Sequence, residues 1–163
     1  MEEDSVIARS RATVASSLDW KQAHATFDDA MRELPVELRG KRPGHYPHSP
    51  WQLAEHIRRA QADLLEFMTN PSYAAPKWPD SYWPLEPEPP SAKAWDECIA
   101  AVQHDRQAIK ELAIRPTLDI TAAIPWGDGQ TYLRTILVAV DHTAYHVGQL
   151  ITVRILLGAW PAT

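Results

Sequence analysis

The sequence predicts an all-α protein, an up-and-down four-helix bundle that forms one domain over residues 1–163. Four long stretches carry apolar residues at helical spacing, which indicates amphipathic helices. The 14 prolines cluster between these stretches and so separate the helices instead of interrupting them. A chain of 163 residues is also the usual size of one compact domain.

The first helix is expected over about residues 5–33, where apolar and small residues recur every three or four positions until Pro35 ends the pattern. After a loop rich in glycine and proline, Ser49 reads as an N-cap and Pro50 as the first residue of a helix. The second helix is therefore predicted over about residues 50–70.

Residues 71–90, here called the strap, hold seven prolines together with Tyr73, Trp78, Tyr82 and Trp83. This composition does not form a helix, yet it is too aromatic for a free linker. We expect an ordered segment that crosses the bundle between the second and third helices. Its aromatic residues either cover a ligand cavity or pin the strap to the helices.

Ser91 is the expected N-cap of the third helix, which ends before an Arg-Pro pair at 115–116. Residues 118–124 are β-permissive, and residues 126–129 form a glycine-containing turn. The fourth helix is then predicted over about residues 131–157.

The fourth helix is apolar on two sides. One face holds Leu133, Ile136, Leu137, Val140, Ala144, Val147 and Ile151, and the roughly opposite face holds Val138, His142, His146, Gln149 and Val153. We expect both faces to be buried, one in the bundle and one under a partner or a lid. This favours a homodimer. The pattern does not decide which face packs in the bundle and which contacts a partner or a lid.

The charge balance argues against some partners. The chain has 16 basic and 21 acidic residues and a formal net charge of -5, so it lacks the basic footprint of proteins that bind nucleic acid or anionic membranes. No apolar run approaches the ~20 residues of a membrane helix. A single cysteine, Cys98, cannot form an internal disulfide, and the N-terminus does not resemble a secretory signal. We therefore expect a cytoplasmic protein.

His142 and His146 are the most informative residues, because a spacing of four places two imidazoles on one helix face. His56, on the second helix, would bring a third imidazole to the same point if the two helices pack together. Three neutral nitrogens suit a divalent metal and leave coordination positions open.

Three further residues are candidates near such a site. Gln149 lies one turn after His146 and could orient its imidazole through a hydrogen bond. His48, in the loop before the second helix, and His24, on the first helix, are possible additional ligands. The alternatives are a solvent-exposed loop residue for His48 and a buried core residue for His24.

The segments SPWQLAEHI at 49–57 and DHTAYHVGQ at 141–149 resemble the DinB-like (YfiT-like) superfamily of metal-dependent enzymes. The resemblance implies a four-helix bundle, commonly dimeric, with zinc or nickel held by His56, His142 and His146. It further implies a small-molecule substrate and either a thiol-dependent S-transferase, which would use a low-molecular-weight thiol, or a hydrolase. The alternative is a non-catalytic dimeric bundle whose metal site is structural or senses a ligand.

Overall fold

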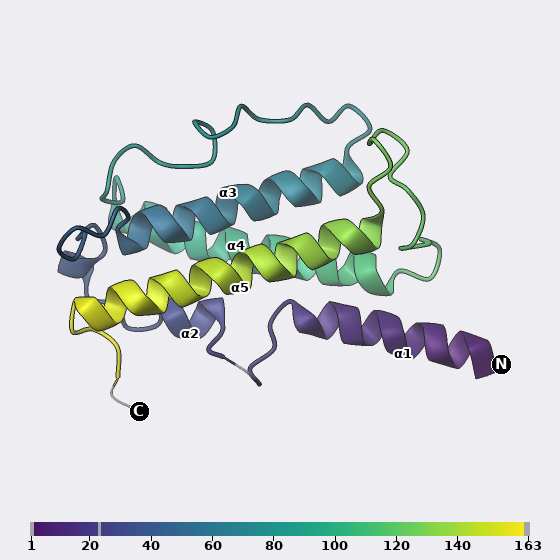
Figure 1. Ribbon diagram of the computed structural model, residues 1–163, viewed down its shortest axis with the longest axis horizontal. Coiled ribbons are helices and arrows are strands. Elements are labelled where there is room, and N and C mark those ends of the chain that lie inside the picture. Colours follow the sequence, from purple (N-terminus) through teal and green to yellow (C-terminus); the bar gives the residue numbers. More distant parts are fainter. Residues whose placement is uncertain (1, 23, 162–163) are drawn as a thin grey trace.

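The computed structural model describes residues 2–22 and 24–161 (Figure 1). Its helices are α1 (Glu2–Ser17), α2 (Phe27–Met31), the 3-10 helix η1 (Val36–Leu38), α3 (Pro50–Thr69), α4 (Ala92–Ile114) and α5 (Tyr132–Leu156). These described residues contain no strand, and one isolated antiparallel bridge joins Ala123 to Thr131. The predicted all-α bundle is therefore confirmed.

The prediction of one continuous helix over residues 5–33 was wrong. The chain leaves the helix after Ser17 and begins α2 at Phe27, and residue 23 lies outside the described residues. A new helix starts because the Thr26 hydroxyl accepts a hydrogen bond from the Asp29 backbone N–H, and the Asp29 carboxylate accepts one from the Thr26 N–H, both at 3.2 Å. The break also lets α1 pack mainly on α4 while α2 packs on α5.

The helices α3 and α4 run in the same direction, and α5 runs opposite to both (Figure 1). One core cluster joins the N-terminal halves of α3 and α4 to the C-terminal half of α5, and a second cluster joins their other ends. The order is therefore not strictly up-and-down, because the strap carries the chain back along the whole length of α3. Some 20 extended residues reach roughly 60 Å, about twice the length of a 20-residue helix.

Caps fix the long helices where the sequence predicts them. The Ser49 hydroxyl accepts from the Gln52 N–H at 3.2 Å, and the Gln52 side chain accepts from the Ser49 N–H, while Pro50 occupies the first turn. Ser91 and Thr131 cap α4 and α5 in the same way, through the backbone N–H three residues later. Secure starts for α3 and α5 matter because these two helices carry the histidines.

The strap is an ordered segment, as expected. The hydroxyl groups of Tyr73 and Tyr82 each donate a 2.7 Å hydrogen bond to the carboxylate of Asp63 on α3. Nearer the start of α3, the Gln52 amide donates to the Pro84 carbonyl at 3.1 Å. These contacts hold the strap against α3 at two places, one in each half of the helix.

A close backbone approach at Gly40 also positions the strap. A Cβ atom at Gly40 would lie 2.9 Å from the Cβ atom and 3.0 Å from the Cα atom of Glu88. We expect Gly40→Ala to push the strap away and to lower the free energy of unfolding by about 1–3 kcal/mol in urea denaturation. Gly148→Ala is the matched control, because a Cβ there meets no atom within 4 Å outside its chain neighbours and the backbone of its own helix. Equal effects of the two variants would show that the contact with Glu88 does not position the strap.

Helix α5 has three faces. Residues such as Ile136 and Leu150 lie in the core, while His142 and His146 face α3. The third face is exposed and carries Leu137, Val138, Tyr145, Ile155 and Leu156. Most residues of the two predicted faces are thus covered within this chain, but Leu137 and Val138 are not.

None of the described helices has the length and apolarity needed to cross a bilayer.

Candidate metal centre

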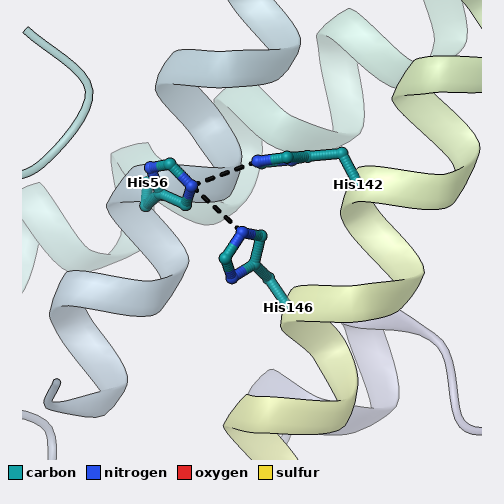
Figure 2. A group of neighbouring side chains, drawn as sticks. All are labelled: His56, His142 and His146. Atoms are coloured by element: carbon teal, nitrogen blue, oxygen red, sulfur yellow. Dashed lines mark hydrogen bonds between the residues drawn. The ribbon is translucent and has the colours of Figure 1, made fainter. Parts of the chain in front are cut away.

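Three imidazoles from two helices meet between α3 and α5. The Nε2 atom of His56 lies 3.1 Å from Nε2 of His146 and 3.1 Å from Nε2 of His142 (Figure 2). One ring nitrogen from each of the three residues lies within 4.8 Å of the other two. His56 and His146 are 2% and 7% exposed, whereas His142 is half-buried, so the site is most accessible from the side of His142.

Hydrogen bonds on the outer ring nitrogens fix the tautomers of two histidines. His56 Nδ1 lies 3.0 Å from the Tyr82 carbonyl oxygen, and His146 Nδ1 lies 2.8 Å from Oε1 of Gln149. Both oxygens accept, so each Nδ1 carries the proton and each Nε2 presents a lone pair. Two lone pairs therefore face each other at 3.1 Å, an arrangement that is repulsive unless a cation lies between them.

A proton is a poor candidate for this cation at neutral pH. Burial lowers the pKa of His56 to about 4, and the hydrogen bond to the Tyr82 carbonyl only partly opposes this. Burial, with the neighbouring His146 and His56, also lowers the pKa of His142 to about 4. Burial lowers the pKa of His146 as well, against the effect of Gln149. The rings are therefore neutral at pH 7, which is the form that binds metals.

The donor set fits a divalent transition metal. Three imidazole nitrogens suit zinc, nickel, copper or iron, and hydrogen-bonded outer nitrogens are typical of ligand histidines. Within the part of the chain that the structure describes, no fourth histidine, cysteine or carboxylate joins the group. Three protein ligands are the number found in catalytic sites, whereas structural zinc sites have four.

The two additional ligand candidates lie elsewhere. His48 is half-buried, and its ring stacks on Trp83 at a centroid distance of 4.1 Å. His24 is exposed in the loop before α2 and lies near Thr143 and Val147, on a face of α5 turned away from the site. The expectation that His24 lies on a helix was wrong, because the helix breaks before it.

The carboxylates closest in sequence are engaged away from the site. Glu55 pairs with Arg58 at 2.7 Å and with Arg59 at 2.9 Å, and Asp63 accepts the two strap tyrosines. Asp141 is exposed on α5. None of them belongs to the histidine group, so we assign none as a ligand.

Two strap residues contribute to the site, although the spacing of residues in the sequence did not identify them as site residues. The Trp83 ring stacks on the His56 ring at a centroid distance of 3.7 Å with an interplanar angle of 6°, and the His48 ring also stacks on Trp83. Tyr82 contributes its backbone carbonyl to His56. The aromatic content of the strap indicated either a cover for a cavity or a pin to the helices, but side-chain composition does not indicate a backbone carbonyl contact.

The comparisons with known proteins identify the family. The family model of the DinB superfamily matches residues 19–150, which include all three histidines. The chain belongs to the DinB superfamily. No curated protein and no solved structure gives a significant match. The family predicted from the two histidine motifs is therefore confirmed.

The Gln149 amide should strengthen metal binding in this DinB superfamily protein. We expect Gln149→Leu to weaken zinc binding by about 10–100-fold, because His146 loses the acceptor that fixes its ring. Competition with a zinc chelator gives the affinity. Gln149→Glu is the matched control, since it keeps an acceptor and should bind zinc at least as tightly as wild type. Unchanged affinity in Gln149→Leu would show that the contact does not support a ligand.

The lowered histidine pKa values predict how the metal-free protein responds to acid. The unfolded chain, with histidine pKa values near 6.5, binds more protons than the folded chain between about pH 6.5 and pH 4. Stability is therefore full above about pH 6.5 and falls as the pH decreases toward 4. We expect Tm to drop by about 5 °C or more from pH 7.5 to pH 5.5. The double variant His56→Gln, His142→Gln should lose most of this dependence; an equally steep dependence would contradict the assignment.

Proposed function

We propose that this DinB superfamily protein is a metal-dependent enzyme that binds zinc or nickel at His56, His142 and His146 and transfers a thiol to a small electrophile. The observation that carries the proposal is a group of three neutral imidazoles, two buried and one half-buried, with no fourth protein ligand among the described residues. Such a site leaves positions for a small molecule, as catalytic sites do.

A divalent metal held by three neutral histidines keeps its full charge and lowers the pKa of a bound thiol or water. The chain's own residues prepare the position. The Tyr82 carbonyl and Gln149 hold two rings with their Nε2 lone pairs directed inward. Trp83 covers the face of His56 and excludes water from that side. Tyr145, 64% exposed and with its ring centroid 4.9 Å from that of His146, flanks the site on α5.

Thiol transfer is favoured over hydrolysis because, among the described residues, no carboxylate lies beside the three histidines to act as a general base. Metal hydrolases commonly use a carboxylate beside the metal to take a proton from water. Glu55 is bound to two arginines and Asp63 to two tyrosines, and no carboxylate of the described residues joins the histidines. A thiol has a lower pKa than water and loses its proton without such a base.

The experiment that tests thiol transfer uses protein reconstituted with cobalt(II). We expect L-cysteine to change the visible and near-ultraviolet absorption of this protein in a saturable manner, whereas L-serine, which lacks the thiol, should not. An assay with thiols and electrophiles would then identify the reaction. No spectral change at saturating L-cysteine would count against transfer, and hydrolysis of activated esters by the same protein would favour the hydrolase. Metal binding without either activity would favour a structural or sensing site.

We also propose that the protein is a homodimer whose interface is the exposed face of α5. Leu137, Val138, Tyr145, Ile155 and Leu156 place apolar surface on one helix face, which supports an interaction surface. Size-exclusion chromatography with light scattering should give twice the chain mass of 18.4 kDa, and Ile155→Glu should give a monomer. A monomeric wild type at all concentrations would contradict this proposal.

A further inference from the structure

A cavity outside the histidine site lies on the side of α3 away from α5. It is a groove of about 1070 Å³ between α3, α4 and the second half of the strap, here called the α3/α4 groove. None of the three metal-site histidines lines it, and Trp83 is the residue common to this groove and the histidine site. Its volume is that of a pocket for a small organic molecule.

Three charged residues of α3 line this groove and carry a net positive charge. Glu55 is almost fully buried and accepts two hydrogen bonds from Arg58, at 2.7 Å each, and one from Arg59 at 2.9 Å. Burial alone would raise the pKa of Glu55, but the two guanidinium groups outweigh it and lower the value. Glu55 is therefore ionised, and one carboxylate faces two guanidinium groups. These three side chains together carry one excess positive charge in a partly buried setting, and the carboxylate of Asp105 on α4 also acts on Arg58.

Both arginines keep donors that the described part of the chain does not use. Arg58 bonds Glu55 through Nε and Nη2, which leaves Nη1 without a partner among these residues. Arg59 bonds Glu55 through Nε and the Ser81 carbonyl through Nη1, at 3.1 Å, which leaves Nη2. Guanidinium groups with spare N–H donors and an excess charge are suited to a carboxylate.

The rest of the lining includes an apolar wall. Trp51 and Cys98 are buried in the walls, and Leu85 of the strap is exposed beside them. Burial raises the pKa of the Cys98 thiol, so this residue is a neutral apolar wall and not a nucleophile. The groove thus combines an apolar surface with a cationic spot on α3.

Four further acidic residues lie at the border of the groove, so its lining as a whole holds five acidic and two basic residues. The four are Asp80, Glu86, Glu88 and Glu97. Asp80 pairs with Lys77 at 2.9 Å and Glu97 pairs with Lys93 at 2.5 Å. All four residues are exposed, so water and salt screen them more than the buried Glu55 and its arginines.

From these observations we infer that the α3/α4 groove is a binding site for a small carboxylate with an apolar body, whose carboxylate is bound by Arg58 and Arg59. The site is separate from the metal centre, and the inference does not depend on the proposed reaction.

The test compares phenylacetate with its neutral isostere phenylacetamide by isothermal titration calorimetry on zinc-loaded wild-type protein. We expect saturable binding of phenylacetate and at least tenfold weaker binding of phenylacetamide, a difference of about 1.4 kcal/mol. Arg58→Met should weaken phenylacetate binding at least tenfold, and so should Ala101→Phe, which fills the groove from α4 without changing its charges. Arg134→Met, which removes an exposed arginine of α5, is the matched control and should change the affinity less than twofold.

The His142→Ala variant tests whether ligand binding in the groove is independent of the metal centre. We expect this variant to bind phenylacetate within twofold of wild type, because no groove contact involves α5. Three results would overturn the inference: equal affinity for acid and amide, unchanged binding in both Arg58→Met and Ala101→Phe, or loss of binding in His142→Ala. A failure of the cobalt and thiol experiment would leave this result unaffected, so the two proposals fail separately.

Discussion

Replacement of His142 by alanine is expected to abolish stoichiometric zinc binding. Wild-type protein reconstituted with zinc should contain about one ion per chain, and His142→Ala and His56→Ala should each contain far less after gel filtration. Each variant leaves two imidazoles, and two ligands hold zinc much more weakly than three. Elemental analysis of tag-free protein provides the measurement.

His104→Ala is the matched control for these variants. His104 is exposed on α4, with a side chain that is 81% accessible, and its Nδ1 lies 3.1 Å from the carboxylate of its neighbour Asp105. Its removal should leave the zinc content unchanged. Zinc retained in both His56→Ala and His142→Ala, with a folded circular dichroism spectrum, would place the metal elsewhere.

Arg154→Met is expected to have the largest effect on stability. Arg154 is 3% exposed, and its guanidinium donates to the carbonyls of Ala30, Arg32 and Ala159 at 2.7–3.0 Å. It therefore ties the end of α2 and the C-terminal segment to α5. Because the variant leaves these carbonyls without their charged donor, we expect a loss of about 3 kcal/mol and a fall in Tm of about 6–12 °C.

Arg134→Met provides the comparison on the same helix. Arg134 is exposed, so its replacement by methionine should change the free energy of unfolding by less than about 0.5 kcal/mol. Urea denaturation of the two variants gives the difference directly. Similar small effects of both variants would show that the Arg154 contacts contribute little, and that the hydrophobic contacts of α2 hold it in place.

The sequence predicted the features that depend on local rules. The starts of α3 and α4 follow from capping residues Ser49 and Ser91, and the end of α3 follows from the proline after Asn70. The meeting of three histidines also followed from helical spacing, because residues four apart share a face of α5 and that face packs on α3. These predictions needed only the helix period and the assumption that long helices pack together.

The features that the sequence did not predict depend on tertiary contacts. The break between α1 and α2 arises where the two segments pack on different helices, although the Thr26 and Asp29 pair was a readable signal for a new helix start. The carbonyl contact of Tyr82 with His56 and the Arg154 clamp join residues far apart in the chain. No periodicity or sequence motif indicates either of these contacts.

X-ray absorption at the zinc edge of the reconstituted wild-type protein would show whether three histidines bind the metal and leave a position open. We expect three imidazole ligands at about 2.0–2.1 Å and at least one further light-atom ligand that a thiol replaces with sulfur at about 2.3 Å. A site with four protein ligands that is unchanged by thiol would overturn the proposed open site and would indicate a structural metal.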